Sequence, residues 1–352
     1  MVGFDVDARS DRAQLILVGA VAIAFIVLGL AVVFNTVLYT ENVASTGAAS
    51  APRDAQILDN EVEYGVKELI ARTNVEGKWQ TLSEARSGID DNVTQYSDGL
   101  MRVQGAAAPT IVSVTTIDST ETIDGISGSD QIGATIQQTD GGQFVDNTDD
   151  GNWTVVDDGA PLGDFNMTVK ANSLAGETSD DKFRVVWNAS STNDNFSVWI
   201  YEESGGNVAI RTANDSAKPA SNFPPDSSEC VLDGTSTGTV EFDFSAGRIL
   251  NHSDCSGMVD ISEEGVPSAS SRNLRFHRGK SASGWFSLTV NQESAVGSGI
   301  NDNTGLSLPV IDSTDSPYYT YGVWTVKLRV TYQSEQASFE RVRVIEVYNR
   351  SR

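Results

Sequence analysis

The clearest strand pattern in the chain is YGVWTVKLRVTY, residues 321–332, in which β-branched and aromatic side chains dominate. A short polar turn around residues 333–336 follows, and a second run of the same kind covers residues 339–348. Two such runs joined by a short turn are typical of an antiparallel β-hairpin. We therefore expect the last part of the chain to form one.

The second run of this hairpin alternates imperfectly between apolar and polar side chains. Successive side chains of a strand point to opposite faces, so Val342 and Val344 would point away from Arg341, Arg343 and Ile345. Both faces of this strand therefore carry apolar residues, and one of them also carries two arginines.

Similar period-two runs, separated by Gly, Asn, Asp and Ser, begin at about Val103. They cover residues 111–117, 165–170, 183–188, 196–201, 208–212, 240–244, 274–277 and 285–290. The pattern predicts a mainly β fold. Residues 102–352 would form an antiparallel β-sandwich-like domain, built either as one sandwich or as two fused sheets.

Residues 41–101 are predicted to form a helical stalk or cap of two amphipathic helices, because apolar side chains recur there at three- and four-residue steps. The first set is Ile57 or Leu58, Val62, Val66, Leu69 and Ile70, and the second is Trp79, Leu82, Ile89, Val93, Tyr96 and Leu100. Gly65, Gly77 and Gly88 weaken a long continuous rod. Packing against the β-rich domain is therefore favoured over a coiled, filament-forming stalk.

An uninterrupted apolar segment, LILVGAVAIAFIVLGLAVVF, covers residues 15–34. At a rise of about 1.5 Å per residue it spans a hydrocarbon core of about 30 Å, so residues 14–40 are predicted to form a transmembrane helix. Arg9 and Arg12 precede the segment closely, whereas no Lys or Arg occurs from residue 13 to residue 52. By the positive-inside rule, residues 1–13 are a cytoplasmic leader and the β-rich domain is extracellular.

The chain is strongly acidic. Its 352 residues include 48 Asp and Glu against 24 Lys and Arg, which gives a formal charge of −24. Such a surface repels phosphate, so nucleic acid is excluded as a partner. The 30 Asp, and the 7 Lys beside 17 Arg, resemble the composition of haloarchaeal proteins, in which molar salt screens the repulsion. An acidic surface protein from a less saline habitat is the alternative.

The residues at the start of the apolar segment resemble a processing site. Arg12, Ala13, Gln14 and Leu15 are similar to the junction of archaeal type IV prepilins and archaellins, and the resemblance extends over about residues 9–45. It implies that a prepilin peptidase cuts between Ala13 and Gln14. The mature helix would then stay in the lipid bilayer or pack with other pilin-like subunits. The alternative is an uncleaved signal anchor.

Two further features fit an extracellular location. Cys230 and Cys255 are the two cysteines of the chain, and we expect them to form a disulfide because external thiols oxidise. Eight N-glycosylation sequons all lie beyond the apolar segment. They are Asn92, Asn152, Asn166, Asn188, Asn195, Asn214, Asn251 and Asn349. Each is either a glycosylation site or an unmodified polar residue.

One loop has some features of a calcium site. Asp146, Thr148 and Asp150 offer oxygen ligands at alternate positions, and Asp157 holds the twelfth position of the loop. Thr148 and the short Asp157 side chain depart from the usual pattern, so an ordinary acidic turn is favoured. No other metal or cofactor is predicted.

Residues for catalysis are scarce. His252, Ser253, Asp254 and His277 supply the residue types of a hydrolase, but no G-x-S-x-G motif accompanies them. The sequence predicts a membrane-anchored, pilin-like cell-surface protein with a structural or adhesive role, such as a minor pilin or filament subunit, rather than an enzyme. The alternatives are a signal-anchored surface receptor or envelope component and, third, an extracellular hydrolase.

Overall fold

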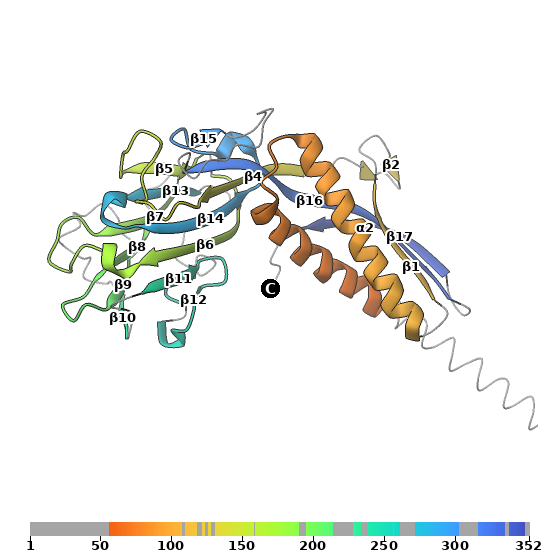
Figure 1. The fold of residues 1–352 in the computed structure, drawn as a ribbon, viewed down its shortest axis with the longest axis horizontal. Helices are drawn as coiled ribbons and strands as arrows, with labels where there is room; N and C mark the ends of the chain where they lie inside the picture. The colour runs from red at the N-terminus through yellow and green to blue at the C-terminus, as the bar shows by residue number, and fades with distance from the viewer. Residues whose placement is uncertain are drawn as a thin grey trace, which may run out of the picture.

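The computed structural model of the chain describes residues 56–107, 110–117, 122–123, 126–127, 131–157, 159–189, 195–213, 228–233, 235, 238–255, 257–260, 272–302, 316–334 and 338–348. In this part, two helices are followed by two antiparallel β-sheets, so the fold is mainly β, as predicted (Figure 1). No helix among these residues is both long and apolar enough to cross a membrane. The predicted leader and transmembrane helix lie outside the described residues.

Residues 56–77 form the first helix, and α2 (Leu82–Ala107) is the second. Among the described residues the larger sheet contains β1 (Ile111–Thr116), β4 (Gln131–Gln138), β6 (Leu162–Lys170), β11 (Thr239–Asp243), β12 (Arg248–Ile249), β14 (Gly284–Val290), β15 (Asn301–Asp302), β16 (Tyr318–Gln333) and β17 (Ser338–Glu346). The smaller sheet contains β5 (Trp153–Val156), β7 (Phe183–Ala189), β8 (Asn195–Glu202), β9 (Val208–Ala213), β10 (Ser228–Leu232) and β13 (Arg272–His277). The pair β2 (Thr122–Ile123) and β3 (Ile126–Ser127) stands between β1 and β4 in the chain.

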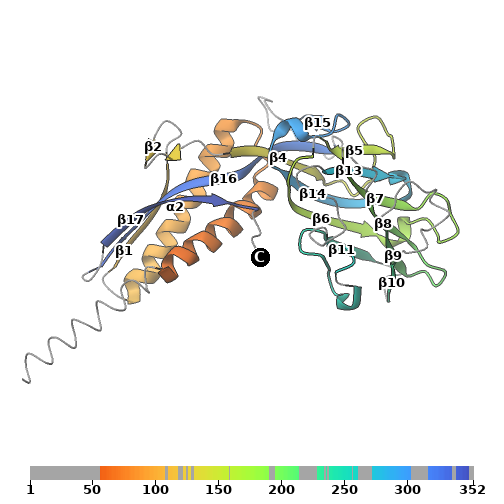
Figure 2. The same ribbon diagram turned by 180° about the vertical axis from the view of Figure 1, so that it is seen from behind.

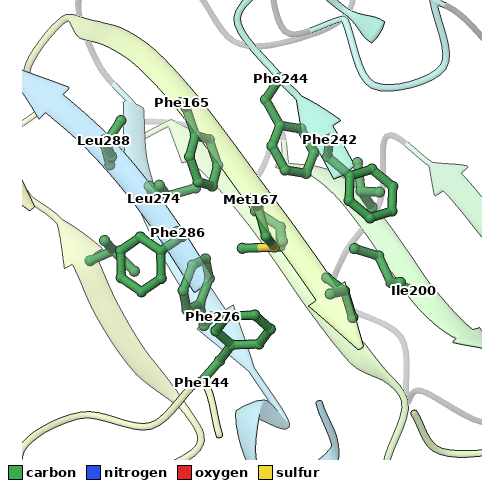
Figure 3. Packing of buried hydrophobic residues seen from close by; sticks show 14 of the residues in the cluster. Phe144, Phe165, Met167, Ile200, Phe242, Phe244, Leu274, Phe276, Phe286 and Leu288 are labelled. Atoms are coloured by element: carbon green, nitrogen blue, oxygen red, sulfur yellow. The ribbon is translucent and has the colours of Figure 1, made fainter. Parts of the chain in front are cut away.

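Two sheets pack face to face as a sandwich with an aromatic core. The larger sheet contributes β4-β14-β6-β11-β12, and the smaller sheet has the order β10-β9-β8-β7-β13-β5. Phe276 of β13 and Phe286 of β14 meet edge to face across the core, with 5.2 Å between their ring centres (Figure 3). Phe165 and Phe244 stack at 4.6 Å. Aromatic pairs of this kind each add about 0.5–1.5 kcal/mol to the burial of their surface.

Strand β16 extends beyond the sandwich into a second lobe. Its first part, Tyr318 to Val323, pairs with β4, whereas its second part, Thr325 to Gln333, pairs with β17 and, over its last six residues, with β1. The two helices lie against one face of β1, β17 and this second part of β16 (Figures 1 and 2). We call these elements together the helical lobe.

The helical lobe has its own apolar core. The predicted helix positions Leu58, Val62, Val66 and Ile70 are buried, and they form one cluster with buried valine and leucine side chains of β1 and β16. The expectation that the helices pack against the strands of their own chain is therefore confirmed.

The helix glycines mark contacts between the helices rather than weak points in a rod. Trp79 lies in the connection between them, and a Cβ atom on Gly77 or Gly88 would come within 2.8 or 2.6 Å of its ring. Gly65 lies in the same way against the ring of Tyr96. These small residues let the two helices approach each other and enclose the aromatic side chains.

The imperfect alternation of the last strand has a physical cause. Arg341 and Arg343 point toward the first helix, where both donate to the carboxylate of Asp59, at 3.0 Å and 2.8 Å. Asp59 is buried, and a buried carboxylate needs such charged partners. Val344 consequently lies on the opposite face of β17, where it is exposed.

A buried amide joins the helical lobe to the sandwich. Asn74 accepts a hydrogen bond from the Val323 backbone N–H and donates one to the Val323 carbonyl, both at 2.8 Å. Its Nδ2 also donates to the Tyr348 hydroxyl at 2.7 Å. The amide therefore pairs with β16 as a neighbouring strand would, at the point where β16 leaves the sandwich.

Several element boundaries differ from the sequence expectations. Helix α2 continues to Ala107, beyond the expected change of pattern at Val103, because Gln, Ala and Arg in its last turns favour a helix. Strands β4, β5 and β10 were not predicted, nor were the two-residue strands β2, β3, β12 and β15. In β4 the apolar residues Ile132, Ala134 and Ile136 alternate, but the pattern is short and is followed by buried Gln137 and Gln138, whose side-chain amides bond to backbone carbonyls.

Candidate functional site

The disulfide connects the two sheets at their edges. Cys230 on β10 and Cys255 on the short 3₁₀ helix η2 (Ser253–Cys255) are bonded, with 5.9 Å between their Cα atoms. β10 ends the smaller sheet and β12, just before η2, ends the larger sheet. The predicted disulfide is therefore confirmed, and it links the edge strand β10 of the smaller sheet to the helix η2 that follows the edge strand β12 of the larger sheet.

The sequon residues differ in their surroundings. Asn152, Asn166 and Asn251 are exposed, whereas the half-buried Asn92 donates its Nδ2 to the Gly88 carbonyl within α2, at 2.7 Å. The other sequons in the described residues, Asn188 and Asn195, are backbone pairing partners on β7 and β8. Asn214 and Asn349 lie outside the described residues, as does the processing motif Arg12, Ala13, Gln14 and Leu15. A glycan attaches to Nδ2, so the three exposed side chains are accessible acceptors, whereas the Nδ2 of Asn92 is engaged within α2.

The calcium candidate forms a tight turn. One carboxylate oxygen of Asp146 accepts bonds from the Thr148 N–H, the Thr148 hydroxyl and the Asp150 N–H, at 2.7–2.9 Å. Asp157 follows β5, where its backbone N–H bonds to Ala295. Across the described part of the chain, no three His, Cys, Asp or Glu side chains are grouped so that they could hold a metal ion.

A groove of about 680 Å³ lies along β6, β11 and β12 on the larger sheet. Its polar lining includes Asn166, Glu241, Asn251 and His252, together with the ion pair between Asp243 and Arg248 at 2.9 Å. Two sequons therefore share one groove. The two histidines of the hydrolase alternative are in different places: His277 is on β13 of the smaller sheet, whereas His252 follows β12 of the larger sheet.

The most unusual surface is the outer face of the smaller sheet, where cationic side chains gather. The pairing register places five residues directly opposite one another in a row across five strands. The row is His277 (β13), Arg184 (β7), Trp199 (β8), Arg211 (β9) and Glu229 (β10). Arg275 lies two residues before His277 on β13 and points to the same face.

The cations on this face differ in whether they have an acidic partner. Arg211 forms an ion pair with Glu229, and Arg278, just after β13, pairs with Asp181 at 3.3 Å. Within the described residues, by contrast, no carboxylate pairs with Arg184 or Arg275. The Nε atoms of Arg184 and Arg275, like that of Arg211, are buried without a hydrogen-bond partner.

Arg184 is the most deeply buried of these arginines, with 9% of its surface exposed. Its guanidinium lies 5.7 Å from the centre of the Trp199 ring, which is within cation–π range. Burial, and then the positive charge of Arg278, lower the pKa of Arg184. The Arg184 guanidinium therefore lies in surroundings that disfavour its charged form.

His277 belongs to the same electrostatic environment. Burial, followed by the charges of Arg184, Arg275 and Arg278, lowers its pKa to about 4. The imidazole is therefore neutral at pH 7 and can both donate and accept one hydrogen bond.

This group was not predicted from the sequence. The runs FRVVWN (183–188) and LRFH (274–277) place an arginine on the outer side of each strand, and that signal is visible in the sequence. The two runs are nearly ninety residues apart, however, and only their pairing in the folded sheet brings the arginines together.

Comparison with known proteins gives one match. Residues 9–130 are similar to a family described as "Family of unknown function (DUF7261)". The matched region includes the predicted junction and apolar helix, both helices of the helical lobe and strands β1 to β3, and it ends before the sandwich. No curated protein and no solved structure matches the chain.

Proposed function

We propose that the chain is a membrane-anchored cell-surface protein, pilin-like at its N-terminus, with a structural or adhesive role. The observation that carries the proposal is the order of its parts. A short charged leader precedes the apolar segment of residues 15–34, and a folded β-rich body with a disulfide follows. The leader and apolar segment suit insertion with the body outside, where a disulfide is stable.

Two further observations support this division of roles. The similarity to DUF7261 covers the anchor region and the helices but not the sandwich, which fits a common anchor module that carries a different external domain. Only 21 residues separate Phe34 from the first helix of the helical lobe, where the described body begins. In this proposal the helical lobe lies near the membrane. Strand β16, which runs through both lobes, places the sandwich farther from the membrane, where it can contact other molecules.

The proposal is tested by the location of the native protein. We expect it to stay with the membrane fraction after an alkaline wash, and an impermeant amine reagent should label the exposed Lys280 on intact cells. The double variant Phe25→Arg, Leu28→Arg should leave the membrane fraction, because each arginine opposes insertion by about 2.5–3.5 kcal/mol. Phe25→Leu, Leu28→Val is the matched control. A wild-type chain that is washed off, or labelled only after lysis, would refute the proposal.

A signal-anchored receptor or envelope component remains the second candidate, because it would use the same anchor. It differs in keeping residues 1–13, so the two candidates are separated by the N-terminus of the mature protein.

A further inference from the structure

We propose that Arg184, Arg275 and His277 form a binding site for an oxyanion, a carboxylate or sulfate group, on the outer face of the smaller sheet. The inference goes beyond the proposed function, because binding at this face does not depend on how the chain is anchored.

The strand register brings the three side chains to one place. His277 on β13 lies directly opposite Arg184 on β7, and Arg275 is the diagonal neighbour of Arg184 on the same face. Directly opposite Cβ atoms in an antiparallel pair are about 4.5–5.5 Å apart, and diagonal neighbours are about 7–8 Å apart. Two long guanidinium side chains at that separation can reach a single small anion.

The charge balance calls for an anionic partner. In a chain of net charge −24, these two arginines are diagonal neighbours on one face of the sheet, and within the described residues neither has an acidic partner. Their neighbours do have one: Arg211 pairs with Glu229 and Arg278 with Asp181. A buried cation without a counter-charge is costly, and a bound anion would remove that cost.

The chemistry of the side chains selects the class of ligand. A guanidinium presents parallel N–H donors that match the two oxygens of a carboxylate or sulfate, and such charge-assisted bonds are stronger than neutral ones. The neutral imidazole of His277 can add one further donor without more charge. A metal cation or a basic peptide would be repelled by the arginines.

The site is open to solvent on one side. Arg184 and its partner ring Trp199 form a buried floor, whereas Arg275 and His277 are half-buried and the Arg278 side chain is 46% exposed. A free anion, or an acidic group that projects from a polysaccharide, can therefore enter from the side of β13.

The test measures binding to the full-length protein in detergent at constant, molar ionic strength. One probe is sodium sulfate, substituted for sodium chloride, and the other is trigalacturonic acid, with the neutral galactose trisaccharide as its control. We expect sulfate and trigalacturonate to shift the side-chain Nε–H NMR signals of Arg184 and Arg275, and the neutral sugar to leave them unchanged.

Variants then assign the binding to these residues. Arg184→Gln and Arg275→Gln should each weaken binding about tenfold or more, because each removes a charge-assisted hydrogen bond. The matched control is Arg248→Gln, which removes the same charge from the larger sheet and should bind as the wild type does. Arg184→Lys keeps the charge but not the fork of donors, so it should fold and still bind more weakly.

Each outcome decides a point. If trigalacturonate binds more than tenfold more tightly than sulfate, the site is supported and the anionic group comes from an acidic polysaccharide. If the two probes bind equally well, the site is supported as one for free anions. Absence of any shift with both probes, or an equal loss in Arg248→Gln, would overturn the proposal. Neither result bears on membrane location, so the proposed function stands or falls separately.

Discussion

At the scale of single residues, Asp59 determines which face of the last strand turns inward. Its carboxylate accepts hydrogen bonds from Arg341 and Arg343, and its side chain is only 9% exposed. Asp59→Ala would leave two arginines facing the first helix without a partner. We expect a loss of about 2–4 kcal/mol in the free energy of unfolding, measured by denaturant titration in molar salt.

The matched control for this substitution lies one turn away on the same helix. Glu63 pairs with Lys67 at 2.8 Å on the surface, and exposed pairs of this spacing contribute about 0.3–0.5 kcal/mol. Glu63→Ala should therefore lower the free energy of unfolding by no more than about 0.5 kcal/mol. Equal losses in the two variants would show that the Asp59 cluster has no special role.

His277 gives a prediction about pH. Its pKa is about 4 in the native state, against about 6.5 in an unfolded chain. Between these values the unfolded state binds a proton that the native state does not, so the free energy of unfolding falls as pH is lowered from about 6.5 to 4. The full effect is at most about 3 kcal/mol, and above pH 6.5 it is absent.

The measurement compares the wild type with His277→Gln, since other groups titrate in the same range and only the difference reports His277. The variant should lose less stability between pH 6.5 and 4 than the wild type does. Parallel pH profiles of the two proteins would contradict the account.

At the scale of elements, two glycines of α2 should respond to substitution in opposite ways. A Cβ atom on Gly88 would meet Trp79 at 2.6 Å, whereas a Cβ atom on Gly99 has no atom within 4 Å. Gly99→Ala should raise the free energy of unfolding by about 0.5–1 kcal/mol, because alanine favours a helix. Gly88→Ala should lower it by about 1–3 kcal/mol through overpacking. Thermal and denaturant unfolding measure both, and stabilisation by Gly88→Ala would refute the proposed helix contact.

Some helices and strands were easier to predict from the sequence than others. The helix positions and most strands were predictable, because their apolar periodicity reflects burial on one face. Strand β4 was not, since its buried Gln137 and Gln138 are satisfied by hydrogen bonds that only the folded chain supplies. The inward orientation of Arg341 and Arg343 on β17 could not be predicted either, because their partner Asp59 is about 280 residues away in the chain.

At the scale of the whole molecule, the same limit applies to the candidate site. The disulfide and the mainly β class follow from composition and local pattern. The cationic row and the passage of β16 through both lobes depend on the pairing of distant strands, and single-sequence periodicity contains no register between them. Sequence therefore predicted the kinds of elements better than it predicted their neighbours.

The charge of the whole chain leads to a prediction about salt. With a formal charge of −24, repulsion within the folded body is screened in molar salt, where the Debye length is about 3 Å, but not at 0.01 M, where it is about 30 Å. We expect the body to lose its cooperative fold when salt is lowered to tens of millimolar. Far-ultraviolet circular dichroism follows this change, and a spectrum that stays constant over the whole range would exclude a salt-dependent fold.

The central claim is that the chain is a processed, pilin-like surface protein, and the most direct test is mass spectrometry of the N-terminal peptide of protein extracted from native membranes. The account predicts that the mature chain begins at Gln14, and that Arg12→Asp and Ala13→Leu retain residues 1–13 while still inserting into the membrane. A wild-type chain that begins at or near Met1, and behaves like both variants, would contradict the pilin-like assignment.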